Sequence, residues 1–268
     1  MGATEVLLDV AVSVAREAAA LALRSRPSAI RDVGTKSSAT DVVTAADVAV
    51  ERLVRARLAE LRPGEPVFGE ETGGVAAEPG QVCWVVDPID GTVNYLYGLP
   101  WYAVSLAAQV DGVSVAAAVI EPDTRREWTA LRGGGSWRDG VALRVSDTTR
   151  LEMSLISTGF AYRAQRRAAQ AAGVARLLPK VRDIRRPGAA SLDLCSVAAG
   201  WVDGYFEHGL SRWDWAGGAL VAEEAGAVVR LSSSSDAVGP DLTFCATPGI
   251  ADQLLVAVKE IGLTEQLP

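Results

Sequence analysis

The segment Asp87-Pro88-Ile89-Asp90-Gly91-Thr92 constrains the fold of this chain more than any other. It directly follows Val82 to Val86, an apolar run with the length and composition of a short buried strand. Pro88 holds Asp87 in an extended conformation, and Gly91 permits a close approach of other atoms to the backbone. We therefore expect a layered fold in which a buried strand ends at a cleft and presents two aspartates there.

This segment has two interpretations. In the first, Asp87, Asp90 and the Ile89 carbonyl converge as hard oxygen ligands of a divalent cation, and a helix that begins at Thr92 offers its unpaired amides to a phosphate. In the second, the segment is an ordinary aspartate-rich turn that caps a helix. Taken alone, the segment does not decide between a metal site and a capping turn.

The overall composition narrows the chemistry that the chain can perform. Its 268 residues are 49% apolar, which is enough for a substantial core in one large domain or two small ones. The formal charge of -7 opposes the binding of nucleic acid and of anionic lipid. A single histidine, His208, is too few for a Ser-His-Asp triad or a multi-histidine metal site to be expected. Carboxylates must therefore carry any chemistry.

No apolar run is long enough to cross a bilayer, and the N-terminus lacks the pattern of a signal peptide. We therefore expect a cytoplasmic protein. The cysteines are odd in number and show no CxxC spacing, which predicts buried thiols rather than disulfides or a zinc site. These cysteines are Cys83, Cys195 and Cys245.

The pattern of apolar residues divides the chain into two halves. Helical spacing predicts amphipathic helices at 6–23, closing near Pro27, and at 46–61. We predict an α+β half at 1–150 with most metal ligands and an α/β half at 151–268 with the substrate-recognition residues, packed as one compact unit. The other predicted strands and helices are 67–68, 82–86, 102–110, 113–120, 126–131, 155–156, 164–178, 181–184, 191–199, 204–207, 215–225 and 227–231, with a turn at Asp111-Gly112. We interpret the run Gly133-Gly134-Gly135 as a turn, because no Lys-Ser/Thr follows it as a phosphate-binding P-loop requires.

Two further carboxylate positions favour a metal site over a capping turn. Glu70 follows the predicted strand at 67–68, and Asp214 lies at the start of a predicted helix. In a common cleft, Glu70, Asp87, Asp90 and Asp214 would repel one another unless metal ions neutralised them. Ligation by oxygen alone indicates magnesium or manganese. That these four residues meet is a hypothesis, because spacing alone does not bring such distant positions together.

These motifs occur in an order that resembles the inositol monophosphatase family, which comprises lithium-sensitive, metal-dependent phosphatases of sugar phosphates. The resemblance covers nearly the whole chain and is greatest for the bacterial inositol-1-monophosphatase branch. It implies an α/β fold, an alternating α-β-α-β-α sandwich. The motifs that carry it are Lys36, Asp41 to Asp47, Gly69-Glu70-Glu71, Asp87 to Thr92, Thr158-Gly159-Phe160, Gly188-Ala189-Ala190, Tyr205 to Gly209 and Trp213 to Gly217.

The resemblance implies two to three magnesium ions in the site, with manganese as a substitute. Glu70, Asp87 and the Ile89 carbonyl would hold one ion. Asp87, Asp90 and Asp214 would hold a second, and a third, weaker ion would share Glu70. One ion would lower the pKa of a bound water while the others stabilise the phosphoryl oxygens and the leaving alkoxide.

The resemblance also implies roles around the metals. Thr92, Glu70 and Asp47 would orient and deprotonate the attacking water, and the amides of Gly91 and Thr92 would bind the phosphate. Lys36 would lean toward the metal-bound anions. The substrate contacts would further include Asp90, Asp214, the backbone amide of Ala190, and Glu207, which would accept hydrogen bonds from a neutral polyol.

The predicted reaction is hydrolysis of inositol-1-phosphate, a phosphorylated polyol, by a homodimer that contacts neither membrane nor, directly, nucleic acid. Alternatives are phosphatases of histidinol phosphate, fructose-1,6-bisphosphate, 3'-phosphonucleotides or other cyclitol phosphates, since fold similarity does not separate these substrates. A noncatalytic regulator of transcription and RNA processing is a further alternative. We interpret His208 as a surface or structural group. Arg182, Arg185 and Arg186 are either a patch that steers substrate or binds a partner, or a solvated or interface cluster, and we favour the cluster.

Overall fold

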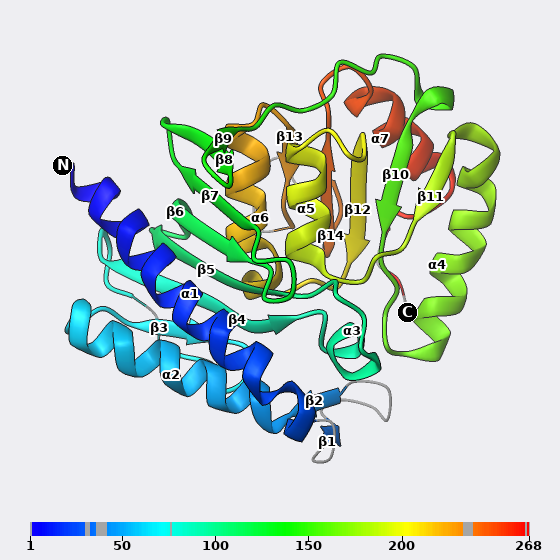
Figure 1. Cartoon of the computed structure of the whole chain (residues 1–268). Coiled ribbons are helices and arrows are strands. Elements are labelled where there is room, and N and C mark those ends of the chain that lie inside the picture. The colour runs from blue at the N-terminus through cyan, green and yellow to red at the C-terminus, as the bar shows by residue number, and fades with distance from the viewer. Residues whose placement is uncertain are drawn as a thin grey trace.

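The computed structural model describes residues 2–29, 33–35, 42–75, 77–232, 238–265 and 267. Its helices and strands form five layers, in which helices alternate with two sheets (Figure 1). The predicted α/β sandwich is therefore confirmed. Within the described residues no helix is both long and apolar enough to span a membrane.

The first sheet has seven strands in the order β3-β4-β5-β6-β7-β8-β9. β3 and β4 are parallel, and each later pair is antiparallel. Asp111 and Gly112 both have positive φ, as a two-residue hairpin turn requires, so the predicted meander is confirmed. The strands are β3 Val67–Gly69, β4 Val82–Asp90, β5 Ala103–Val110, β6 Val113–Ile120, β7 Glu127–Leu131, β8 Gly135–Arg138 and β9 Val141–Ala142.

The strand that carries the aspartates is longer than predicted. β4 does not end at Val86 but continues to Asp90, and its pairing with β5 shifts register between Asp87 and Asp90. Pro88 lies inside this irregularity, because proline has no N–H to donate to the ladder. The two aspartates therefore belong to the strand itself, which fixes them more rigidly than a loop would.

The second sheet has five strands in the order β11-β10-β12-β14-β13. β10 is parallel to β11 and β12, whereas β14 is antiparallel to β12 and β13. A separate small sheet pairs β1 Val33–Thr35 with β2 Val42–Thr44. The five strands are β10 Leu155–Thr158, β11 Asp183–Arg185, β12 Gly204–His208, β13 Val228–Arg230 and β14 Leu242–Ala246.

Helices cover both sheets and fill the space between them. α1 and α2 pack on the outer face of the seven-stranded sheet, α5 and α6 lie between the sheets, and α4 and α7 lie on the far side of the five-stranded sheet (Figure 1). The helices are α1 Ala3–Ala29, α2 Ala45–Leu61, α3 Thr92–Tyr97, α4 Ala164–Leu177, α5 Ala190–Ala198, α6 Arg212–Glu224 and α7 Ala251–Glu260, with short 3₁₀ turns at Leu151–Met153 and Leu178–Lys180.

Burial follows the helical pattern of the sequence. On α1, Leu7, Ala11, Val14 and Ala18 face the core. On α2, the face that buries Val50 also buries two acids one turn apart, Asp47 and Glu51. A buried carboxylate requires hydrogen-bond donors or a cation, so this face of α2 serves more than packing.

Several predicted boundaries are wrong. α1 continues two residues beyond Pro27, where a proline removes a single bond from the last turn. The strand predicted at 181–184 is β11, two residues later. α6 begins at Arg212 rather than Trp215, because Ser211 and Asp214 cap its start. The glycine run at 133–135, in contrast, is the tight turn into β8, so the turn predicted there is confirmed.

The sequence patterns did not indicate β1, β2, β8, β9, β14 or α7. The proposed division at residue 150 stays a prediction. α6, from the second half, packs against strands of both sheets.

Candidate active site

A cleft of about 380 Å³ lies at the end of β4, beside the first turns of α3, α5 and α6. This volume suits a small phosphorylated alcohol. Most of the site residues predicted from the sequence line this one cleft, although they come from five separate parts of the chain. They are Glu70, Asp87, Ile89, Asp90, Gly91, Thr92, Ala190, Glu207 and Asp214.

Three carboxylates meet in the cleft. Ligand oxygens of Asp87, Asp90 and Asp214 all lie within 4.8 Å of one another. At an effective dielectric of about 20, two charges roughly 4 Å apart repel by about 4 kcal/mol. Burial and the neighbouring carboxylates, Glu70 foremost among them, accordingly hold the pKa values of Asp87 and Asp214 well above the ordinary range.

This donor set fits a divalent cation. All of the converging side chains offer oxygen, which magnesium and manganese prefer, and a cation would relieve the repulsion that raises their pKa values. Glu70 lines the same cleft, and its negative charge helps to raise the pKa values of Asp87, Asp90 and Asp214. The oxygen donors and their mutual repulsion therefore favour a metal site over a simple capping turn.

The start of α5 holds Asp90 in place. The backbone amide of Ala190 donates to Asp90 Oδ1 at 3.0 Å, and that of Ser191 donates to Oδ2 at 2.7 Å. The Ser191 hydroxyl also donates to Oδ2. These bonds lower the pKa of Asp90, but burial outweighs them and raises it to about 6. The Ala190 amide, predicted to contact substrate, is thus bonded to Asp90.

Asp214 combines a structural role with its place in the cleft. It lies in the first turn of α6 and accepts a hydrogen bond of 2.5 Å from the Ser211 amide. A carboxylate has about four lone pairs, so one capping bond leaves it able to bind a cation. The helix-capping and metal-binding interpretations of Asp214 are therefore compatible.

Thr92 connects the cleft to α2. Its hydroxyl lies 3.3 Å from Asp47 Oδ1 and 3.0 Å from the Ile89 carbonyl oxygen. Asp47 is fully buried behind Thr92 and does not line the cleft itself. Gly91 adopts a φ of +91°, and a Cβ there would lie 3.1 Å from the Trp101 carbonyl oxygen, so the turn into α3 requires glycine.

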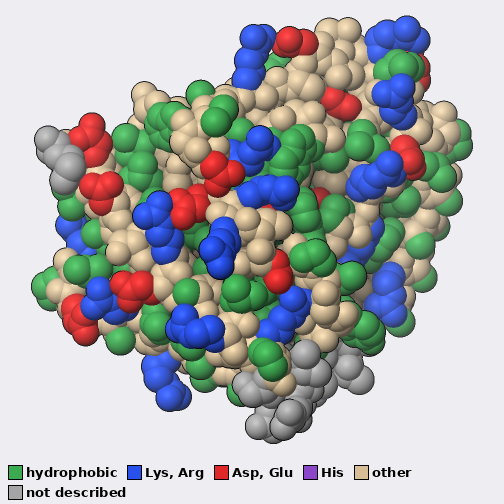
Figure 2. All heavy atoms as spheres, in the orientation of Figure 1, with side chains coloured by type: hydrophobic (Ala, Val, Ile, Leu, Met, Phe, Trp, Pro, Cys, Tyr) green, Lys and Arg blue, Asp and Glu red, His purple; other side chains and the backbone are tan. Residues whose placement is uncertain are grey.

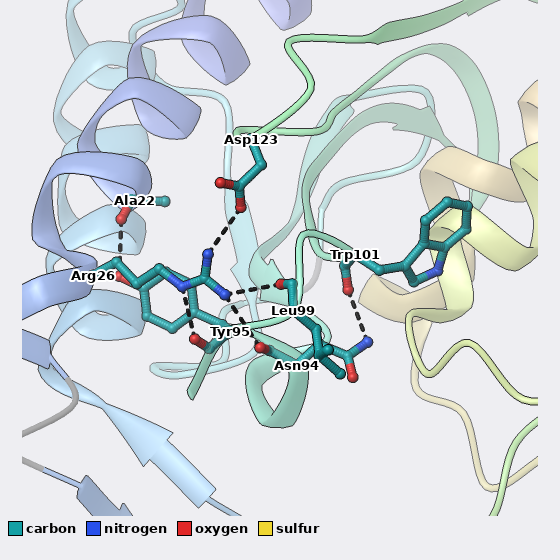
Figure 3. Close-up of polar contacts among 7 residues, drawn as sticks. All are labelled: Ala22, Arg26, Asn94, Tyr95, Leu99, Trp101 and Asp123. Atoms are coloured by element: carbon teal, nitrogen blue, oxygen red, sulfur yellow. Dashed lines mark hydrogen bonds and ion pairs between the residues drawn. The ribbon is translucent and has the colours of Figure 1, made fainter. Parts of the chain in front are cut away.

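A network of polar contacts fixes the position of α3 (Figure 3). Arg26, near the end of α1, donates to the carbonyl oxygens of Tyr95 and Leu99 at 2.8 Å and pairs with Asp123 at 3.0 Å. Asn94 donates to the carbonyl oxygens of Trp101 and Pro187, both at 2.8 Å. The contact with Pro187 ties α3 to the loop that leads into α5.

The opposite wall of the cleft carries Glu207, at the end of β12. Burial raises its pKa to about 7, although the Tyr205 hydroxyl, 2.7 Å from Oε2, and the positive charge of Arg186 oppose this shift. Neighbouring His208 is buried, and its Nε2 lies 2.6 Å from the Leu263 carbonyl oxygen. Burial lowers the His208 pKa to about 4, as expected of a structural group rather than a catalytic base.

The raised pKa of Glu207 predicts how stability depends on pH. Between pH 4.5, its ordinary pKa, and about 7, the folded protein binds a proton that the unfolded chain has lost, so stability falls as pH rises. Glutamine does not ionise, so chelator-treated Glu207→Gln does not lose stability in this way as pH rises. We expect it to exceed the parent protein by roughly 1–2 kcal/mol in urea unfolding at pH 8, with the gap nearly closed at pH 4.5. A gap independent of pH would contradict the assignment, and Glu78→Gln, at an exposed glutamate, is the control.

Several cleft residues were not anticipated from the sequence. Arg163, the residue before α4, and Arg166, in its first turn, line the cleft, as does Arg186. Arg186 is exposed and lines the cleft, which favours the substrate-steering alternative for this arginine, whereas Arg185 is exposed and pairs with Asp183. Sequence alone gave no signal for Ser191, because its role depends on the fold. Lys36 lies outside the described residues.

Comparison with known sequences agrees with this geometry. The sequence model described as the inositol monophosphatase family matches residues 3–262, nearly the whole chain. The chain belongs to this family. Inositol monophosphatase family members are metal-dependent phosphatases, in accord with the carboxylates of the cleft.

Similar proteins come from several bacteria. An inositol-1-monophosphatase of Mycobacterium leprae is 52% identical, and the alignment covers 96% of this chain and 95% of that protein. A protein of Escherichia coli K12 named Nus factor SuhB is 36% identical, with 94% and 98% covered. The solved structure of Mycobacterium tuberculosis SuhB matches with a TM-score of 0.83 at 43% identity and covers 97% of this chain and 98% of that one.

Proposed function

We propose that this protein is a magnesium-dependent phosphomonoesterase that hydrolyses inositol-1-phosphate to inositol and phosphate. The observation that carries the proposal is the meeting of Asp87, Asp90 and Asp214 beside Thr92 and Asp47. The name of the Mycobacterium leprae relative supports the choice of alcohol. The first step is binding of the phosphate near the turn at Gly91, where the first amides of α3 complement its charge.

The residues that would hold magnesium are Glu70, Asp87, Asp90 and Asp214, with the Ile89 carbonyl. When bound, the cations supply a water of lowered pKa and neutralise the phosphoryl oxygens and the leaving alkoxide. Manganese has the same ligand preference and is expected to substitute.

Thr92 and Asp47 are suited to direct the attacking water. The Thr92 hydroxyl has one hydrogen, which it donates to Asp47 or to the Ile89 carbonyl, and its lone pairs remain able to accept a hydrogen bond from water. We assign Thr92 to orient that water and Asp47 to receive its proton through the hydroxyl. Glu70, at the rim of the same cleft, provides a second carboxylate for this task.

The alcohol binds against Glu207 and the start of α5. Above about pH 7 the Glu207 carboxylate is ionised and accepts hydrogen bonds from ring hydroxyls. Arg163, Arg166 and Arg186 line the cleft and supply the positive charge that an anionic substrate needs in a protein of net charge -7. Arg166 pairs with Asp241, whereas Arg163 and Arg186 are exposed.

A substrate panel tests the proposal. Phosphate release is measured from inositol-1-phosphate, histidinol phosphate, fructose-1,6-bisphosphate and a 3'-phosphonucleotide, each with magnesium and with chelator. We expect the greatest kcat/KM for inositol-1-phosphate and no release with chelator. Preference for another member of the panel would reassign the alcohol, and release in chelator would refute the metal-dependent reaction.

A regulatory role is the second candidate, because the Escherichia coli relative is named Nus factor SuhB. On the described part of the face in Figure 2, basic and acidic side chains are interspersed, without the broad basic region that direct RNA binding favours. This face therefore favours a protein partner over RNA for such a role. Capture of transcription factors by the full chain tests it independently of catalysis.

Three further expectations stay predictions. The homodimer is tested by the molar mass in solution. Inhibition by lithium is tested in the phosphate-release assay. A cytoplasmic location is tested by cell fractionation.

A further inference from the structure

Glu51 is a buried acid that the proposed reaction does not use. It lies on α2, one turn after Asp47, and its side chain is 1% exposed. A carboxylate in such a position is costly unless several donors surround it. Its surroundings therefore show what it stabilises.

The donors around Glu51 come from the loop that carries Glu70. The amide of Glu71 donates to Glu51 Oε2 at 2.8 Å, and the amide of Thr72 donates to Oε1 at 3.2 Å. The Thr72 hydroxyl also donates to Oε1. Glu51 thus binds the two residues that directly follow the proposed metal ligand Glu70.

Arg55 contacts both Glu51 and the backbone of the same loop. Its guanidinium donates to Glu51 Oε1 at 2.9 Å and to the carbonyl oxygens of Val67 at 3.0 Å and Gly73 at 2.5 Å. Gly69 and Gly73 also exchange a reciprocal pair of backbone bonds of 3.0 Å. The stretch from 67 to 73 is consequently held by one ion pair, in which the carboxylate is buried and the Arg55 side chain is half-buried.

The fit around Glu51 is close. A Cβ at Gly69 would lie 2.5 Å from the Glu51 carboxylate, so glycine at 69 allows the carboxylate to reach under the loop. Glu70 itself lines the cleft and faces Asp87 and Asp214. Its backbone is therefore fixed from beneath while its side chain points toward the other carboxylates.

We propose that Glu51, supported by Arg55, is a positioning residue that sets Glu70 in the geometry needed to bind the metal ion. The inference deepens the proposed function and rests on it, because it concerns the same metal site. Groups that orient metal ligands through hydrogen bonds commonly contribute 10–100-fold to metal affinity. Glu51 would act in this way through the backbone rather than through the ligand's side chain.

Glu51→Gln tests the proposal with little change in volume. Glutamine has one acceptor oxygen and places an amide group against the remaining donors, so the loop loses part of its anchor. We expect calorimetry with magnesium, and with manganese as a second probe, to show a Kd raised by at least about tenfold. In phosphate release the half-saturating magnesium concentration should rise by the same factor, while kcat at saturating magnesium stays within about twofold of the parent protein.

Rescue by magnesium separates positioning from a folding defect. Thr72→Val, which removes one donor and leaves the Glu51–Arg55 pair, should raise the Kd by a smaller factor and covers the case in which Glu51→Gln does not fold. Glu60→Gln alters a glutamate that is 61% exposed on the same helix and should change neither quantity. Unchanged metal affinity in folded Glu51→Gln and Thr72→Val would overturn the inference. No metal binding by the parent protein would instead refute the proposed function.

Discussion

Asp90→Asn and Asp214→Asn are each expected to lower kcat for inositol-1-phosphate by at least about a thousandfold, or about 4 kcal/mol in activation free energy. Each change removes one ligand charge from a cleft in which three carboxylates lie within 4.8 Å. The measurement is phosphate release at saturating magnesium. Asp252→Asn, at an exposed position on α7, is the control and should retain full activity.

Stability measurements exclude unfolding as the cause of this loss. In chelator, removing a charge relieves repulsion, so Asp214→Asn should melt no lower than the parent protein. Asp90→Asn should gain less thermal stability, because the single acceptor oxygen of asparagine cannot accept hydrogen bonds from the amides of both Ala190 and Ser191. Full activity in either folded variant would remove that residue from the metal site.

Thr92→Val is expected to reduce kcat by roughly 10²–10⁴-fold with little change in KM, while Thr92→Ser retains most activity. Valine has nearly the shape of threonine but lacks the hydroxyl that joins Asp47 to the cleft. Serine keeps this hydroxyl and loses only a methyl group. Steady-state kinetics of both variants at several pH values is the measurement.

The comparison of the two Thr92 variants is the decisive part of that experiment. A structural role alone predicts that valine, the closer match in volume, disturbs the protein less than serine. An equal loss in both variants would contradict the proposed proton path through the hydroxyl. Such a result would not contradict the proposed metal site.

Much of this site could be predicted from the sequence because its ligands lie at recognisable breaks between elements. Asp87 and Asp90 stand where an apolar strand meets Pro88 and Gly91, and Asp214 stands where a helix begins. Such positions combine a strict backbone requirement with a polar side chain. Their order along the chain made the resemblance specific.

Residues that act only through tertiary contact could not be found in this way. Ser191 bonds to Asp90 across 101 positions of sequence, and Glu51, on α2, accepts a hydrogen bond from the amide of Glu71 in the turn after β3. Arg186 follows directly after β11 and the exposed Arg185, so its place in the cleft depends on how that strand pairs. No spacing rule links such pairs, because the two sheets and α5 must form before they meet.

The same limit explains the wrong boundaries. The apolar run predicts a strand that ends at Val86, with a turn at Pro88, yet pairing resumes between Asp90 and Ala103 after the register shift. Tertiary pairing outweighed the local proline signal. This difference matters for function, since it makes the two aspartates part of the sheet.

The most direct test of the account is a magnesium titration of the chelator-treated protein with inositol-1-phosphate as substrate, followed by phosphate release. The carboxylate cleft predicts no release without metal, saturable recovery as magnesium is added, and no recovery at any magnesium concentration for Asp214→Asn. Turnover that persists in chelator, or that recovers fully in Asp214→Asn, would contradict the claim that these carboxylates hold the catalytic metal.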